Sequence, residues 1–249
     1  MFYDQSAFPL RFEWGEAAIR YLAQGCGAVV IVDVLSFGTA VDVALGRGAT
    51  VLPYRWKDGS AASFAEAQGA LLASHERRFT GGQPGRWSLS PASLAILPEG
   101  ARLVLPSPNG SALSVLAAAS GAAVYSACLR NAGAVAAHVG ARCGTVLVVA
   151  AGERWPDGSL RPADEDLWGA GAVIASLGLL ASPEAEVAAQ AFLAVRPELA
   201  AKLRACGSGR ELMERGFGAD LDWAAAYGVS RVVPGLWDGA YSDVAAEPC

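Results

Sequence analysis

Apolar runs separated by polar turns predict that strands and helices alternate along most of the chain. Short, β-branched apolar runs are typical of strands that are covered on both faces of a sheet. Such runs predict strands over residues 28–32, 50–54, 102–106, 122–128, 145–151 and 231–234. Because helical spacing follows most of these runs, we expect an α/β fold, a layered sheet of mostly parallel strands flanked by helices.

Apolar residues at helical spacing, several of them followed by glycine, predict the intervening helices. These cover a segment after Asp33 that ends near Gly46, together with residues 13–23, 63–73, 112–119, 132–139 and 167–180. Further helices over 183–195, 197–206, 208–215 and 220–227 make the C-terminal portion, residues 182–228, rich in helix. Asp238-Gly239 is typical of a two-residue β-hairpin. No repeat or linker divides the chain, so we expect one α/β domain over residues 1–249.

The composition of the chain indicates which binding partners and which cellular compartment to expect. The chain has 249 residues, of which 53% are hydrophobic, and can bury a core without disulfides or metals. A net charge of −5 without a run of Lys or Arg argues against nucleic acid as a partner. No apolar stretch reaches the roughly 18 residues that cross a bilayer, and no signal-peptide pattern is present, so we expect no membrane association. Five cysteines without a C-x-x-C pair favour the cytoplasm.

The segment from Ala28 to Leu45 joins an apolar strand, a small-residue turn and a helix, and Asp33 stands where the strand ends. Ligands of open α/β sheets bind at the carboxyl ends of strands, and the first turn of a helix offers free N–H groups to an anion. We therefore expect Asp33 and the turn with Ser36, Gly38 and Thr39 to belong to a site. The alternative is that Asp33 or Thr39 only caps the helix.

Three further turns are candidates for binding an anion. Asn109, Gly110 and Ser111 repeat the arrangement of a strand that ends in a polar, glycine-bearing turn before a helix. Asn131 stands in N-cap position before the next helix, which capping alone explains. Gly81 and Gly82 would let backbone amides approach a ligand closely, although an ordinary surface turn is the alternative.

The longest polar insertion, residues 152–166, gathers ionisable side chains before a helix. They are Glu153, Arg154, Asp157, Arg161, Asp164, Glu165 and Asp166. Carboxylates at a helix N-terminus satisfy the helix dipole. They also suit Mg²⁺, which takes one or two carboxylates, keeps several waters and binds phosphate. The two interpretations are compatible, because one carboxylate can cap the helix while another coordinates.

The chain lacks the residues of several familiar catalytic and phosphate-binding motifs. The two histidines, His75 and His138, give a Ser-His-Asp site no support. The chain has no G-x-x-x-x-G-K-[ST] loop and no Rossmann glycine spacing. A D-x-D-x-T phosphatase motif starting at Asp33 fails at Leu35.

Motifs along nearly the whole chain resemble, in the same order, those of the 2-phosphosulfolactate phosphatases. They are 33–39 (DVLSFGT), Gly81-Gly82 with Ser90-Pro91, 108–111 (PNGS), 131–135 (NAGAV), 151–152 (AG) with Glu165-Asp166 and 169–171 (GAG), 216–220 (GFGAD), and 232–234 (VVP) with Asp238-Gly239. The shared order, rather than any single motif, carries the resemblance.

The resemblance implies a Mg²⁺-dependent phosphatase that converts 2-phosphosulfolactate to sulfolactate and phosphate, on a route to coenzyme M. Position by position, it implies Asp33, Glu165 and Asn131 as catalytic residues and Asp33, Glu165 and Asp166 as metal ligands. The turns with Gly38-Thr39 and Asn109-Gly110-Ser111 would hold the phosphoryl oxygens. Direct attack by water and an aspartyl phosphate on Asp33 both stay open.

The chain departs from the family's pattern at Ser36-Phe37-Gly38-Thr39, where the family has Arg-Ala-Ser-Thr, and at Gln83, where an acidic residue is usual. Because a sulfonate and a carboxylate need positive donors, Arg130, Arg154 or Arg161 would replace the lost arginine. We expect a small anionic phosphoester as the substrate. A non-catalytic binder of a phosphorylated or sulfonated acid and a phosphatase for another small phosphoester are the alternatives, and the oligomeric state, monomer or homodimer, stays open.

Overall fold

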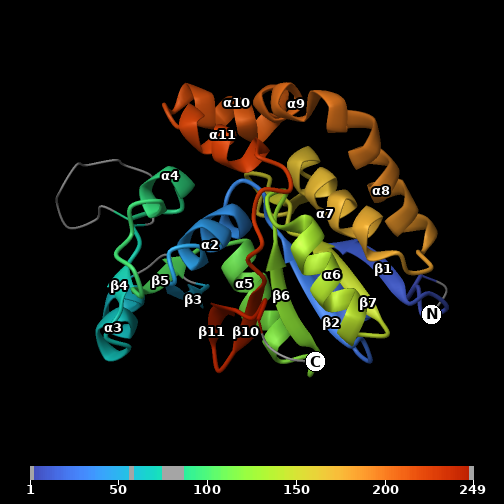
Figure 1. Cartoon of the computed structure of the whole chain (residues 1–249), viewed down its shortest axis with the longest axis horizontal. Coiled ribbons are helices and arrows are strands. Elements are labelled where there is room, and N and C mark those ends of the chain that lie inside the picture. Colours follow the sequence, from blue (N-terminus) through green and yellow to red (C-terminus); the bar gives the residue numbers. More distant parts are fainter. Residues whose placement is uncertain (1–2, 56–58, 75–86, 247–249) are drawn as a thin grey trace.

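The computed structural model describes residues 3–55, 59–74 and 87–246, which fold into a nine-stranded sheet with helices on both faces (Figure 1). The sheet order is β1-β7-β2-β6-β10-β11-β3-β5-β4. The strands are β1 (Leu10–Trp14), β2 (Ala28–Val32), β3 (Thr50–Tyr54), β4 (Leu71–Leu72), β5 (Arg102–Pro106), β6 (Ala123–Ala127), β7 (Val146–Ala150), β10 (Pro234–Trp237) and β11 (Ala240–Asp243). Most neighbouring strands are parallel, which confirms the predicted α/β class.

Most helices up to α7 alternate with strands in the sequence, and α8 to α11 then follow one another without an intervening strand. They are α1 (Gly15–Leu22), α2 (Phe37–Leu45), α3 (Ser60–Ala67), α4 (Pro91–Leu94), α5 (Gly110–Ala118), α6 (Ala132–Arg142), α7 (Asp164–Leu177), α8 (Pro183–Val195), α9 (Leu199–Ala205), α10 (Gly207–Glu214) and α11 (Gly218–Ala225). A 3₁₀ turn, η1 (Arg196–Glu198), joins α8 to α9. The helix-rich C-terminal portion predicted from the sequence is therefore present.

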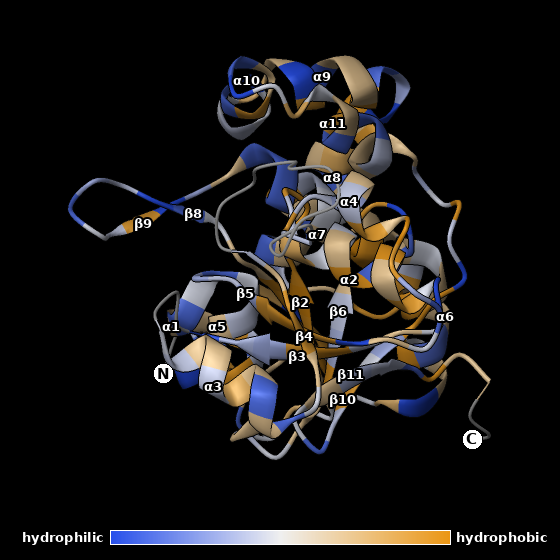
Figure 2. Ribbon diagram, turned by 90° about the vertical axis from the view of Figure 1, so that its left-hand side faces the viewer, coloured by the Kyte–Doolittle hydropathy of each residue, from blue (hydrophilic) through white to orange (hydrophobic). Residues whose placement is uncertain are grey.

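Strand β2 is buried along its whole length because helices cover both faces of the sheet. Val30 and Val32 pack in the core formed with α6 and α7, whereas Val29 and Ile31 pack in the core formed with α1, α2 and α5. Figure 2 shows the strongly hydrophobic ribbon of β2 in the interior. Asp33, the next residue, therefore lies at the end of a strand that is packed on both faces.

A β-hairpin, β10–β11, joins two parallel groups of strands. β10 pairs antiparallel with β6, and β11 pairs antiparallel with β3, so β5 and β6 are not neighbours in the sheet. The hairpin predicted from Asp-Gly is confirmed, with Asp238 at φ 48° and Gly239 at φ 77° in its turn. The strand predicted over 231–234 instead begins at Pro234.

Each of the helices predicted over 13–23 and 63–73 includes residues that belong to a strand at an edge of the sheet, and α3 also begins earlier than predicted, at Ser60. β1 occupies Leu10–Trp14, and α1 begins only at Gly15. α3 ends at Ala67 because Gly69 adopts φ +57°, a conformation that leaves the helix, and β4 follows.

Two segments expected to be irregular contain short elements. The end of segment 79–91 begins α4, whose N-cap Ser90 accepts a hydrogen bond from the Ser93 amide. The insertion 152–166 forms the hairpin of β8 (Glu153–Arg154) and β9 (Leu160–Arg161). α7 then starts at Asp164 rather than residue 167, and ends before Gly178, which is left-handed at φ 64°.

The helices α9, α10 and α11 gather at one end of the sheet, while α8 packs along α7 (Figure 1). Ser208 and Leu212 of α10 line a cavity together with Asp33, which places this helical group above the end of β2. In the part of the chain that the structure describes, no helix has the length and apolar character needed to cross a membrane.

Candidate functional site

Asp33 is a buried carboxylate that accepts hydrogen bonds from the first turns of two helices. Its Oδ1 accepts the Phe37 amide of α2 at 3.0 Å, and its Oδ2 accepts the Gly110 amide of α5 at 3.0 Å. The first N–H groups of a helix have no partner within the helix, so a carboxylate at the end of β2 satisfies both turns. The capping contacts of the alternative interpretation are thus present, on a side chain that also lines a cavity.

Asp166, in the first turn of α7, joins the ends of β2 and β7. Its Oδ1 accepts the Val34 amide at 2.7 Å, and its Oδ2 accepts the Gly152 amide at 2.9 Å. Burial, and then the charges of Asp33 and Glu165, raise the pKa of Asp166 well above its usual range. Asp166 therefore fixes the backbone beside Asp33, within electrostatic reach of two other carboxylates.

Glu153, the first residue of β8 and three positions after the end of β7, is the carboxylate that sequence reasoning left out of the site. Its Oε2 accepts a hydrogen bond from Asn109 Nδ2 at 3.0 Å. Burial, and then the charges of Asp33 and Glu165, raise the pKa of Glu153 to about 7. Its position just after a buried strand, like that of Asp33, is the signal by which the sequence could have identified it.

These contacts close into a hydrogen-bonded ring formed by Asp33, Asn109-Gly110, Gly152-Glu153 and Asp166. Four hydrogen bonds link its members: Asp33 to Gly110, Asn109 to Glu153, Gly152 to Asp166, and Asp166 to Val34 beside Asp33. The ring brings together residues far apart in the sequence. It fixes three carboxylates through N–H donors of the backbone and of one amide side chain.

A cavity of about 210 Å³ opens on the ring. Its floor and sides include Asp33, Ser36, Ser107, Asn109 and Glu153, and α10 supplies Ser208, Glu211, Leu212 and Arg215. A second cavity, of about 250 Å³, shares Asn109 and Glu153 and extends past Trp14, Arg154 and Leu160. The first cavity combines carboxylates, hydroxyls and one guanidinium, whereas the second is bordered by more apolar groups.

Most of the turn residues predicted to hold phosphate already make hydrogen bonds or close packing contacts within the protein. Thr39 Oγ1 donates to the Val34 carbonyl and Ser111 Oγ donates to the Leu105 carbonyl, each at 2.7 Å, and both side chains are fully buried. A Cβ on Gly38 would lie 2.5 Å from the Ala127 carbonyl oxygen, and one on Gly110 would lie 2.3 Å from the Phe37 side chain. Gly81 and Gly82 lie outside the described residues.

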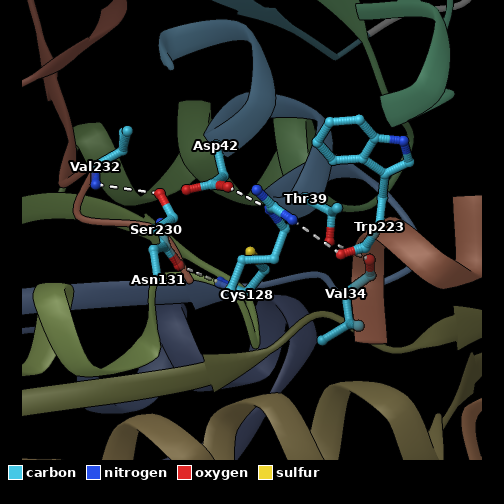
Figure 3. A network of polar contacts seen from close by, with 9 residues as sticks. Val34, Thr39, Asp42, Cys128, Asn131, Trp223, Ser230 and Val232 are labelled. Atoms are coloured by element: carbon cyan, nitrogen blue, oxygen red, sulfur yellow. Dashed lines mark hydrogen bonds and ion pairs between the residues drawn. The ribbon is translucent and has the colours of Figure 1, made fainter. Parts of the chain in front are cut away.

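Asn131 is not among the described residues that line the cavity. It is fully buried, and its Oδ1 accepts the Cys128 amide at 2.8 Å, so its side chain closes the turn before α6 (Figure 3) and makes no capping hydrogen bond to that helix. To bring Asn131 beside the Asn109 turn, the strands that precede the two residues, β6 and β5, would have to be neighbours, and they are not. Its catalytic role stays a prediction.

The three arginines proposed to recognise a second anion lie in different surroundings. Arg130 Nε donates to Asp42 Oδ2 at 2.6 Å and its guanidinium lies 5.0 Å from the Trp223 ring. Asp42 and Trp223 are labelled in Figure 3. Arg154 lines the second cavity and donates to the Gly158 carbonyl. Arg161 donates to Ser208 Oγ at 3.2 Å, and its charge lowers the pKa of Glu153 against the larger raising effects. Arg161 is thus linked to the ring through its effect on Glu153, and Arg154 through the cavity that it shares with Asn109 and Glu153.

The cavity is lined by oxygen donors of the kind that Mg²⁺ prefers. Among the described residues, no group of three or more His, Cys, Asp or Glu side chains is arranged to hold a metal ion. Mg²⁺ needs only one or two carboxylates, since water and substrate complete its octahedron. Asp33 and Glu153 face one cavity, and buried Glu165 acts electrostatically on Glu153. This excess of negative charge fits a divalent cation.

Two comparisons with known proteins bear on this arrangement. The family model described as 2-phosphosulpholactate phosphatase matches residues 19–239, a range that contains every member of the ring. The probable 2-phosphosulfolactate phosphatase of Deinococcus radiodurans is 29% identical over 217 residues, which cover 84% of this chain and 88% of the relative. Because the family model spans most of the chain, the protein belongs to the 2-phosphosulfolactate phosphatase family.

Proposed function

We propose that the protein hydrolyses the phosphate monoester of a small hydroxy acid, with 2-phosphosulfolactate as the substrate and Mg²⁺ as the cofactor. Membership of a family of phosphoric monoester hydrolases supports the reaction class. The observation that carries the proposal is that Asp33 and Glu153 face one small cavity while the ring fixes their positions.

A phosphoryl group approaching this cavity would be repelled by the carboxylates unless a cation lay between them. Bound Mg²⁺ would neutralise charge on the phosphoryl oxygens and stabilise charge that develops in the transition state. We assign Asp33 as a ligand because it lines the cavity. Glu165 and Asp166 stay predicted ligands. Neither is among the described residues that line the cavity, and Asp166 joins the Val34 and Gly152 amides, so we assign Asp166 chiefly a positioning role.

The residues of the chain would contribute position and polarity. Asp33 is oriented by the Phe37 and Gly110 amides, so its carboxylate presents a fixed face to the cavity. Asn109 orients Glu153, which would hold a proton near neutral pH and deliver it to the leaving oxygen. Ser36 and Ser107 add hydroxyl groups to the cavity wall.

A phosphate-release assay tests the proposal. The panel contains 2-phosphosulfolactate, other phosphorylated hydroxy acids and phosphoesters of neutral alcohols, each with Mg²⁺ and with a chelator. We expect turnover that requires Mg²⁺ and is fastest with 2-phosphosulfolactate. Tight binding of one compound without turnover of any would identify a non-catalytic binder, and preference for another phosphoester would replace the substrate.

A further inference from the structure

The cavity has a positively charged side chain in its lining. Of the described residues that line it, Arg215, which directly follows α10, is the one that carries a positive charge. The family model spans this residue, and the motif 216–220 (GFGAD) begins directly after it, but neither gives it a role. A role for Arg215 therefore rests on its surroundings in the structure.

The guanidinium of Arg215 is oriented by its own helix. Glu211, one turn earlier, accepts Nη1 at 2.9 Å, and the Phe217 ring lies 6.0 Å from the guanidinium carbon. Within the described part of the chain, no further hydrogen bond from this guanidinium is found. Arginine presents its donors as a planar fork that matches a carboxylate or a related oxyanion. Glu211 thus holds one edge of the Arg215 guanidinium, and the other edge is available to a ligand.

The helix that carries Arg215 is anchored to the ring side of the cavity. Arg161 of β9 donates to Ser208 Oγ at 3.2 Å, in the first turn of α10. Leu35, Leu89 and Leu212 contribute apolar surface to the same cavity. The lining therefore combines the carboxylates of Asp33 and Glu153, the ion pair of Glu211 with Arg215, and apolar groups, around a volume suited to a small metabolite.

We propose that Arg215 is a specificity-determining residue that binds a second anionic group of the substrate, a carboxylate or a sulfonate, while the phosphoryl group lies at the Asp33–Glu153 end. This inference rests on the proposed function and deepens it. It names the side chain that would distinguish phosphoesters of small acids, the proposed substrate class, from phosphoesters of neutral alcohols.

The test compares 2-phospholactate with isopropyl phosphate, which has a methyl group in place of the carboxylate. Arg215→Gln should raise KM for 2-phospholactate about 10- to 100-fold, the effect of losing a charge-assisted hydrogen bond, with kcat nearly unchanged. Its kcat/KM for isopropyl phosphate should change less than about twofold. Arg215→Lys should recover part of the loss, since it keeps the charge but not the fork.

Arg210→Gln is the matched control, because Arg210 is exposed on the same helix and does not line the cavity. It should leave both substrates unaffected. Equal losses on both substrates in Arg215→Gln, or the same loss in Arg210→Gln, would overturn the proposal, as would no loss at all.

Calorimetric binding of the two compounds separates this inference from the proposed function. If the wild-type protein binds 2-phospholactate without turning over any phosphoester, hydrolysis fails, yet a selective affinity loss in Arg215→Gln would still support the role of Arg215. If hydrolysis proceeds with equal affinity for both compounds, the proposed reaction stands and the inference falls.

Discussion

The hydrogen-bonded ring and the Asp42–Arg130 pair both hold carboxylates inside the protein, but they compensate the charge differently. Asp42 Oδ2 lies 2.6 Å from Arg130 Nε, and the Arg130 guanidinium lies 5.0 Å from the centre of the Trp223 ring. Burial raises the pKa of Asp42, against the lowering effects of Ser230 and Arg130. The ring carboxylates accept hydrogen bonds from N–H groups, and burial, followed by the charges of Asp33 and Glu165, raises the pKa of Glu153. We expect the carboxylate that is paired with a cation to serve the fold, and the grouped carboxylates to serve the proposed site.

The largest expected effect comes from Asp33→Asn. Phosphate release should fall at least about 1,000-fold, because the cavity loses the carboxylate closest to the proposed chemistry. Steady-state phosphate release measures the loss, and circular dichroism checks that the fold is intact. Asp42→Asn, which removes an equally buried carboxylate, is the control and should lower stability instead. Wild-type turnover by Asp33→Asn would remove Asp33 from the reaction.

Arg130→Met tests the other side of the comparison. The free energy of unfolding should fall by about 3 to 5 kcal/mol, because Asp42 would be left buried without its cation. Urea denaturation measures this change, and adding Asp42→Leu to the same chain should restore part of it. A raised KM at unchanged stability would instead place Arg130 in the substrate site, as the sequence predicted.

Mg²⁺ should stabilise the wild-type protein. At about 100 times its dissociation constant, a ligand that binds only the folded state adds about 2.7 kcal/mol to the free energy of unfolding. Thermal unfolding with Mg²⁺ and with a chelator measures the difference. Asp33→Asn should lose most of this stabilisation, whereas Asp42→Asn should keep it. An unchanged Tm in the wild type would argue against a magnesium site in the ring.

The smallest effect is expected for Glu153→Gln, and it depends on pH. Since the pKa of Glu153 rises from 4.5 to about 7 on folding, its contribution to stability is fully present below pH 4.5 and is lost as pH rises through 7. With chelator, Glu153→Gln should exceed the wild type by about 1 to 2 kcal/mol at pH 8 and match it at pH 4.5. Denaturant titrations at the two pH values measure both differences. A lower stability of the variant at pH 8 would show that the ring tolerates the ionised carboxylate.

Much of the sheet could be predicted because its interior strands are apolar along their length. The bounds of β2, β3 and β5 agree with the prediction. The missed strands β1 and β4 lie at the two edges of the sheet, where they are only partly covered. A half-polar strand such as β1, with Arg11 and Glu13, has no continuous apolar run to mark it.

The site was only partly predictable because its assembly depends on the packing of helices. Between β2 and β5 the sheet inserts β6, β10, β11 and β3, yet the Gly110 amide reaches Asp33 because α5 packs against β2 and β3. No sequence pattern indicates that α5 packs across these strands, or that α10 brings Arg215 to the cavity.

Gly171 belongs to the motif 169–171 (GAG) that the chain shares with the family, and packing explains the glycine. A Cβ there would lie 2.0 Å from the Ala188 carbonyl oxygen.

The position of the β10–β11 hairpin has a consequence for how the two halves of the sheet are joined. The strand groups β1-β7-β2-β6 and β3-β5-β4 share no direct pairing, and the segment that bridges them follows all of their strands in the sequence. Asp33 follows β2 in the first group and Gly110 follows β5 in the second, so removing Pro234 to Asp243 would leave the sheet that carries both residues in two unconnected halves.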